Sequence, residues 1–236
     1  MEILNKDMLY ELAKRLDFPS LIRLLSSSKQ IKEKVSKSSV WMYKLIQDFP
    51  DYKSLNIEDL KECYILLYQL TMLKTKLKEN KFVEQSIYEI YNTPKLYLYA
   101  TDLSFIPKEI GKLRNLRILG IFNNDKLYEI PKEICNLQNL QSLDLSVNKL
   151  LEIPKEIGNL SNLQSLDLSV NQLRYIPKEI GKLSNLYYLN LYNNYLTLLP
   201  KEIGKLTNLQ KLYLTSNQLK EIPEEIRNIK SLQINS

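Results

Sequence analysis

The chain has 236 residues, of which 33 are basic and 27 acidic, and a formal net charge of +6. It contains no histidine, which excludes Ser-His and Cys-His catalysis and histidine-ligated metal sites. Its five glycines form no phosphate-binding loop, and its two cysteines, Cys63 and Cys135, have no metal-binding or disulfide spacing. We therefore expect no cofactor and no metal.

The beginning of the chain has acidic residues at once and no apolar stretch of the kind that opens a signal peptide. No run of 18 apolar residues is present to span a membrane. Basic residues are spread thinly, and many adjoin a glutamate, whereas a nucleic-acid-binding protein gathers them on one face. We expect an intracellular, cytoplasmic protein that binds neither nucleic acid nor membrane.

Residues 1–80 contain no repeat, and their apolar residues recur at helical spacing, as in Met8, Leu12 and Leu16. Pro19 lies where a second helix would begin, and Trp41 is the only tryptophan. This region predicts a small all-helical domain.

Residues 1–48 open with Leu4, followed by an acidic residue, apolar helix positions, a Leu-Asp break, a leucine-rich second helix and Trp41. This order resembles the F-box family, although Asn5 stands where that family usually has proline. The resemblance implies docking to the Skp-type adaptor of a cullin–RING ubiquitin ligase. The residues that would make this contact are Leu4, Leu9, Leu12, Leu16, Leu21, Leu24 and Trp41. The alternative is that they form the ordinary core of a helical cap.

Residues 81–236 repeat one unit, whose clearest copy is NLQSLDLSVNQLRYIPKEIGKL from Asn162 to Leu183. The prolines of the recurring Ile-Pro element lie at 107, 131, 154, 177, 200 and 223, in steps of 24, 23, 23, 23 and 23 residues. A fixed period of this length is typical of a solenoid. The pattern L-x-x-L-x-L-x-x-N-x-L resembles the leucine-rich repeat. The resemblance implies an α/β solenoid, a short curved array of about six repeats with parallel strands on its concave face.

Several features of the array follow from the repeat. Residues 82–95 align with half a repeat and predict an N-terminal cap. Proline should start a short helical turn on the convex side, and Asp125-Lys126 should insert one residue after the second strand. Leu232 and Ile234 begin a further strand, whose open edge predicts self-association. A ladder that bonds backbone groups inside the turns is predicted at Thr101, Asn124, Asn148, Asn171, Asn194 and Asn217.

Alternation along the predicted strands leaves a set of side chains on the concave face. Two aromatic groups lie on either side of small and acidic side chains. Exposed aromatic groups favour protein binding. The alternative is that tyrosine is simply abundant, with 16 in the chain. The expected protein-binding residues are Tyr97, Tyr99, Phe122, Asp144, Asp167, Tyr188, Asn190, Tyr192 and Tyr213.

Asp144 and Asp167 should lie about 5 Å apart on neighbouring strands, a separation that also suits a retaining glycosidase. The face is open and nothing distinguishes the two acids, so we expect no catalysis there. A basic side chain of a partner is the expected occupant.

The predicted function is a non-enzymatic adaptor that presents a target, held on the concave face, to a ubiquitin ligase. One alternative is a binding or scaffold module whose helical domain is only a cap. A ubiquitin ligase with a reactive Cys63 is disfavoured because no activating neighbour is visible. The Lys, Asn, Ile and Tyr bias with the F-box-like start resembles proteins of large DNA viruses of amoebae, which would imply a host cytoplasm.

Overall fold

The computed structural model describes residues 92–99, 103–230 and 232–235. The chain divides into two compact units, Met1–Leu73 and Lys74–Ser236. The expected F-box-like residues from Leu4 to Trp41, the half-repeat cap before residue 92, Cys63 and Thr101 lie outside the described residues. The expectations placed on them, and the domain boundary at residue 81, stay predictions.

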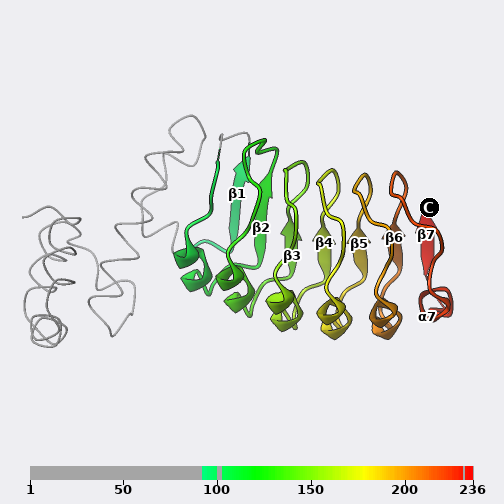
Figure 1. The fold of residues 1–236 in the computed structure, drawn as a ribbon. Coiled ribbons are helices and arrows are strands. Elements are labelled where there is room, and N and C mark those ends of the chain that lie inside the picture. Colours follow the sequence, from blue (N-terminus) through cyan, green and yellow to red (C-terminus); the bar gives the residue numbers. More distant parts are fainter. Residues whose placement is uncertain (1–91, 100–102, 231, 236) are drawn as a thin grey trace, which may run out of the picture. The chain divides into compact units, whose positions relative to one another are not determined.

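The described part of the chain forms one parallel sheet of seven strands, stacked in sequence order (Figure 1). Each of the five inner strands pairs with the strand one repeat before it and the strand one repeat after it, which confirms the predicted solenoid. The strands are β1 (Lys95–Tyr99), β2 (Ile118–Phe122), β3 (Ser142–Asp144), β4 (Ser165–Asp167), β5 (Tyr188–Asn190), β6 (Lys211–Tyr213) and β7 (Gln233–Asn235).

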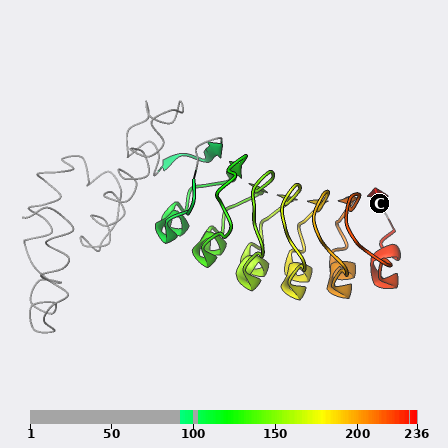
Figure 2. The same cartoon turned by 45° about the horizontal axis from the view of Figure 1, so that its top comes forward.

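Short helices line the side of the stack opposite the strands (Figure 2). Each follows the proline of its repeat, whose carbonyl accepts the first bond, as from Ile157 N to Pro154 O at 2.9 Å. Proline therefore caps the helix rather than occupying its first turn as predicted, because its ψ is extended, at 141° for Pro154. The helices are η3 (Lys108–Lys112), η4 (Lys132–Asn136), η5 (Lys155–Asn159), η6 (Lys178–Lys182), η7 (Lys201–Lys205) and α7 (Glu224–Arg227).

The core lies between the strands and the helices and repeats one set of apolar side chains. In the third repeat the buried side chains include Leu143 of β3, Leu145 directly after β3, and Ile157 of η5, all of them fully buried. A single coil has no second layer against which to bury this set, so each repeat depends on its neighbours. Truncation of one such leucine to alanine costs about 2–5 kcal/mol.

The predicted asparagine ladder is confirmed from Asn124 to Asn217. Asn171 shows the pattern: its Nδ2 donates to Leu145 O at 2.9 Å and to Leu168 O at 3.1 Å. Its Oδ1 accepts from Leu150 N at 3.0 Å. One side chain thus satisfies backbone groups of two consecutive repeats, which would otherwise be buried without partners.

The predicted insertion after β2 is also present, and it alters the ladder locally. Asn148 Oδ1 accepts from Asn124 N at 3.0 Å, whereas the later ladder asparagines accept from the residue two positions beyond the preceding one. Beyond the inserted residue, Leu127 N donates to Asn124 O at 3.2 Å, and the Leu127 side chain is buried. The extra residue therefore stays in the loop, and the core keeps its register.

At the other end of the sheet, β7 pairs with β6 through Gln233, Ile234 and Asn235, as expected for the further strand. The self-association expected at this edge stays a prediction.

One position in each repeat restricts how closely neighbouring helices can pack. A Cβ added at Gly158 would lie 2.5 Å from Glu179 O, a backbone atom of the next repeat. Cys135 occupies the same position of its own repeat and is buried, and burial, with Glu156 and Glu133 nearby, raises the pKa of its thiol to about 12. A side chain thus stands at this position in that repeat and, as Arg227, in the last one, whereas the other four repeats have glycine.

Gly158→Ala should therefore destabilise the array by about 1–3 kcal/mol, because overpacking against backbone cannot be relieved by a rotamer change. Cys135→Ala should cost less, since that position already holds a Cβ. Urea unfolding of the two variants measures the difference, and equal losses would contradict the packing argument.

A second local constraint lies just before each ladder asparagine, where the backbone is left-handed. Val147 and Val170 both have φ 54°, while Asn193 has φ 53°. Left-handed backbone is disfavoured for a β-branched residue and tolerated by asparagine. Two repeats thus carry strained valines at these turns.

Val147→Asn should stabilise the protein by about 1 kcal/mol, in line with the cost of left-handed backbone for L-residues. Val147 is 42% exposed, so the exchange sacrifices little apolar burial. The reverse substitution, Asn193→Val, is the matched control and should lower the melting temperature. A Val147→Asn variant that melts no higher than wild type would show that the strain is relieved elsewhere.

Candidate functional site: the concave sheet face

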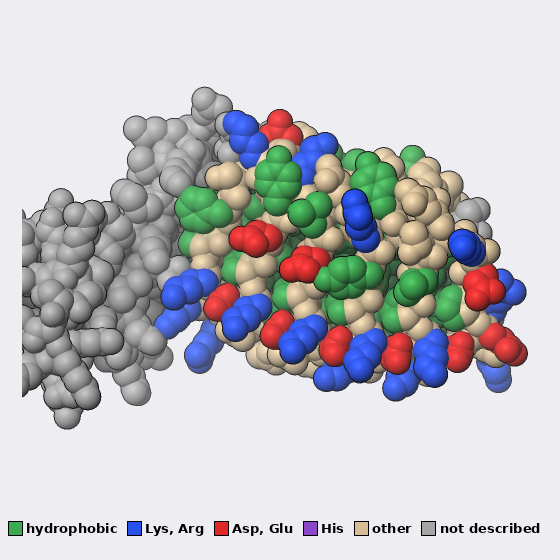
Figure 3. Space-filling view, in the orientation of Figure 1, with side chains coloured by type: hydrophobic (Ala, Val, Ile, Leu, Met, Phe, Trp, Pro, Cys, Tyr) green, Lys and Arg blue, Asp and Glu red, His purple; other side chains and the backbone are tan. Residues whose placement is uncertain are grey.

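The strand register brings the predicted site residues together in adjacent columns on one face of the sheet. The central column runs across consecutive strands as Tyr97, Gly120, Asp144, Asp167, Asn190 and Tyr213. Figure 3 shows acidic side chains in the middle of the strand face with hydrophobic side chains beside them. The same view shows a row of alternating acidic and basic side chains below, along the helices.

The first aromatic group lies over β1 and β2, and we call Tyr97, Tyr99 and Phe122 the aromatic cluster. The rings of Tyr99 and Phe122 stack at 5.4 Å between centroids and 6° between planes. A Cβ added at Gly120 would lie 2.7 Å from Tyr97 Cδ1 and 3.1 Å from Phe122 Cε1. Both rings therefore lean over Gly120, which is buried and leaves room for them only because it has no side chain.

The polar residues of the central column share one local structure at the ends of β3, β4 and β5. Asp144 Oδ1 accepts from Ser146 N at 2.9 Å, and Asp167 Oδ1 accepts from Ser169 N at 2.9 Å. Asn190 Oδ1 accepts from Tyr192 N at 3.0 Å. Such bonds to the N–H two residues on are typical of Asp and Asn at turns. These side chains therefore also have a structural role, which the sequence reasoning missed.

The two aspartates differ in how fully the protein itself satisfies them. Asp167 Oδ1 also accepts from Ser169 Oγ at 2.6 Å, and Asp167 Oδ2 accepts from Asn190 Nδ2 at 3.0 Å and Tyr188 OH at 3.4 Å. Asp144 accepts only the Ser146 N–H among the described residues. Asp144 Oδ2 thus receives no hydrogen bond from the described residues, and Asp144 is half-buried.

The second aromatic group lies over β5 and β6. The rings of Tyr188 and Tyr213 lie 5.6 Å apart at 48°, and burial, followed by the charge of Asp167, raises the pKa of Tyr188. Tyr192, expected in the same group, follows the end of β5 and is 41% exposed. Tyr188 and Tyr213 therefore form a ring pair on this side of the face, and the short side chains of Ser142 and Ser165 lie between them and the aromatic cluster.

A second ladder of asparagines, which the sequence reasoning missed, runs along the exposed side of the stack. Asn162 Nδ2 donates to Gln138 O at 2.7 Å, and Asn185 Nδ2 donates to Ser161 O at 2.8 Å. The signal was present in the sequence, because an Asn-Leu pair recurs in every full repeat. Its role is to satisfy backbone carbonyls, so it is structural.

A row of exposed apolar side chains just before the Ile-Pro (or Leu-Pro) pairs was missed as well. It lies outside the concave face, and its members occupy positions that vary from repeat to repeat. They are Phe105, Tyr128, Leu151, Tyr175 and Leu198.

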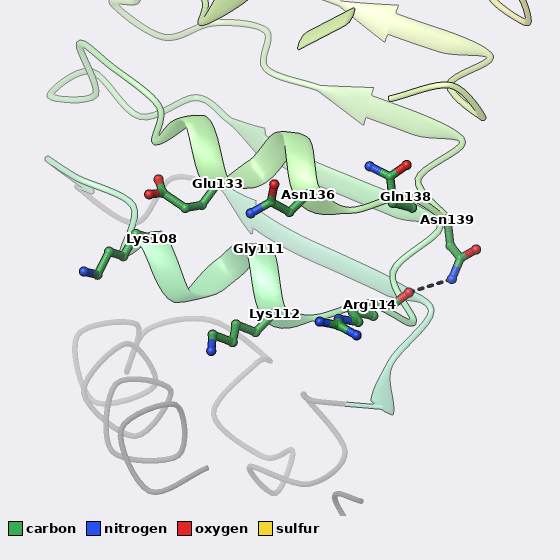
Figure 4. A pocket seen from close by; sticks show the side chains of 8 residues that line it. All are labelled: Lys108, Gly111, Lys112, Arg114, Glu133, Asn136, Gln138 and Asn139. Atoms are coloured by element: carbon green, nitrogen blue, oxygen red, sulfur yellow. Dashed lines mark hydrogen bonds between the residues drawn. The ribbon is translucent and has the colours of Figure 1, made fainter. Parts of the chain in front are cut away.

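A hollow of about 590 Å³ lies on the convex side, between η3 and η4 (Figure 4). Figure 4 shows the ammonium groups of Lys108 and Lys112 at separate places along the hollow, and Asn139 Nδ2 donates to Arg114 O at 2.8 Å. Its polar groups do not converge on one point. Among the described residues, no group of three or more acidic, cysteine or histidine side chains is placed to hold a metal ion. Nor does any helix within the described ranges have the length and apolar character needed to cross a membrane.

Comparison with known proteins decides the family. A family model of the leucine-rich repeat region matches residues 43–172, and a leucine-rich repeat model matches residues 161–219 and 184–234. The chain belongs to the leucine-rich-repeat proteins. The search of curated proteins found no match.

Solved structures of this family share the fold. A leucine-rich-repeat protein of Leptospira interrogans is 44% identical with a TM-score of 0.59, over 66% of this chain and 38% of that one. A plant ice-binding protein is 30% identical with a TM-score of 0.56, over 65% of this chain and 56% of that one.

The ectodomain of an Arabidopsis thaliana membrane receptor kinase, solved in complex with Casparian strip integrity factor 2, is 32% identical with a TM-score of 0.51. The match covers 62% of this chain and 21% of that ectodomain. Each match thus spans less than two thirds of the length of the other protein.

The unequal bonding of the aspartates predicts unequal stability effects. Asp167→Ala should destabilise the array by about 1–3 kcal/mol, because it leaves several donors without their acceptor. Asp144→Ala should cost about 0.5–1.5 kcal/mol, the worth of one typical hydrogen bond. Thermal and urea unfolding of the two variants tests the order, and a larger loss for Asp144→Ala would contradict it.

Proposed function

We propose that this leucine-rich-repeat protein is a non-enzymatic interaction adaptor that holds a target protein on the concave sheet face. The observation that carries the proposal is the arrangement on that face of two aromatic groups around short side chains and the Asp144 carboxylate. Tyr97 and Tyr99 are 45% and 42% exposed. Exposed aromatic groups of this kind are enriched in protein interfaces, where they supply much of the binding free energy.

The second half of the proposal concerns residues 1–80. Their resemblance to the F-box family supports docking of Leu4, Leu9, Leu12, Leu16, Leu21, Leu24 and Trp41 to a Skp-type adaptor of a cullin–RING ligase. The protein would then act by proximity in the cytoplasm, bringing its target to a ligase that performs the chemistry. The alternative is a binding or scaffold module in which the helical domain only covers the end of the array.

Two separate measurements distinguish these functions. Purified Skp-type adaptor should bind the wild-type chain and should not bind a Leu4→Ala/Leu12→Ala/Trp41→Ala variant. Because these substitutions can unfold residues 1–80, a Leu9→Ala variant that keeps the wild-type circular dichroism spectrum provides the second comparison. Absence of wild-type binding would reject the ligase role and leave the binding module.

Target binding is tested by photo-crosslinking in a lysate, with matched pairs of tyrosine variants. Tyr97→Ser/Tyr192→Ser removes aromatic side chains from the concave face and should abolish the crosslinked species. Tyr128→Ser/Tyr175→Ser removes tyrosines of similar exposure, 52% and 46%, from outside that face, and should leave it intact. Equal effects of the two pairs would reject the concave face as the binding surface.

A further inference from the structure

We infer that Asp144 and the aromatic cluster together bind an arginine side chain of the partner protein. The inference rests on the proposed function, since it specifies what the concave face recognises.

The first support is the Asp144 carboxylate. Asp144 Oδ1 is held by Ser146 N at 2.9 Å, and no described residue donates to Oδ2. The neighbouring Asp167 is already satisfied by Ser169, Asn190 and Tyr188. The bond from Ser146 fixes the orientation of the Asp144 carboxylate, so a partner donor meets an acceptor that is already in place. The expected basic occupant is therefore assigned to Asp144 alone rather than to the space between the two acids.

The second support is the position of the aromatic rings relative to this carboxylate. Gly120 and Asp144 are direct partners in the strand register, so their Cα atoms lie about 4.8 Å apart. The rings of Tyr97 and Phe122 lean over Gly120. The two rings thus lie over the residue that neighbours Asp144 on the adjacent strand.

Guanidinium is the group that matches both features at once. It is planar and stacks on aromatic rings, and its fork of N–H donors fits a carboxylate. A lysine ammonium can neutralise Asp144 but has no plane to stack. Lys95 on β1 and Lys211 on β6 lie in the column next to the central one, toward the two ends of the face. The two aspartates therefore give the centre of the face a negative charge, although the whole chain carries +6.

Panning a random dodecapeptide phage library on the full chain tests the inference directly. Peptides retained by wild type and lost on Tyr97→Ser/Tyr192→Ser define binders of the concave face. We expect arginine to be enriched among them, and synthetic copies to lose at least tenfold in affinity when that arginine is replaced by citrulline, which keeps the shape and removes the charge.

Asp144→Asn should weaken the same peptides at least tenfold. Glu129→Gln, which removes an equal charge at an exposed position outside the strands, is the matched control and should change affinity less than twofold. Melting curves of each variant separate loss of binding from loss of folding. Face-dependent peptides without arginine enrichment, or with equal affinity for Asp144→Asn, would overturn the arginine site and leave the proposed function standing. If no face-dependent peptide is recovered, both are rejected.

Discussion

The whole array depends on satisfying the backbone groups that each coil buries where it turns. Asn171 accepts from Leu150 N at 3.0 Å and donates to Leu145 O at 2.9 Å, so its side chain joins two repeats. A buried amide or carbonyl without a partner costs about 1–3 kcal/mol, and every repeat contains several. Because the asparagine satisfies these backbone groups, the leucines of successive repeats can be packed into one continuous core. The second ladder, through Asn162 and Asn185, also bonds backbone carbonyls of the preceding repeat, but at exposed positions.

This constraint divides the positions of the repeat into two kinds. The recurring leucine, asparagine, glycine and proline residues build the solenoid. Substitution of one of them changes the stability of the fold, as the contact of Gly158 with the next repeat illustrates. The outward positions of the strands differ between repeats, as Tyr97, Gly120 and Asp144 do although they are paired in the register. The strands are evenly spaced, about 4.8 Å apart, so equivalent outward positions are regularly placed and only their side chains differ.

Much of this was predictable because a period of 23 residues specifies strand order, inward leucines and ladder positions together. The site was predictable only as a set of residues. That Asp144 and Asp167 would differ could not be read from two nearly identical repeats, because the difference comes from their neighbours. Asp167 faces Asn190 across the register, whereas Asp144 faces Gly120 on one side. Rotamers decide which neighbour donates, and sequence spacing carries no information on them. Proline was predicted to be the first residue of each helical turn but is the residue before it. Its φ fits a helix, whereas its ψ is extended, and the sequence does not specify ψ.

The two nearly identical central repeats therefore present different surroundings to the same aspartate. Duplication placed the same carboxylate on two adjacent strands, but the Asn190 amide and the Tyr188 hydroxyl turn one of them into part of the structure. The other borders a glycine, and the missing side chain lets the rings of Tyr97 and Phe122 lie beside it. The difference between the two aspartates thus arises where one central copy borders a repeat of different sequence. The surroundings of a side chain can change in this way without any change in the repeat that carries it.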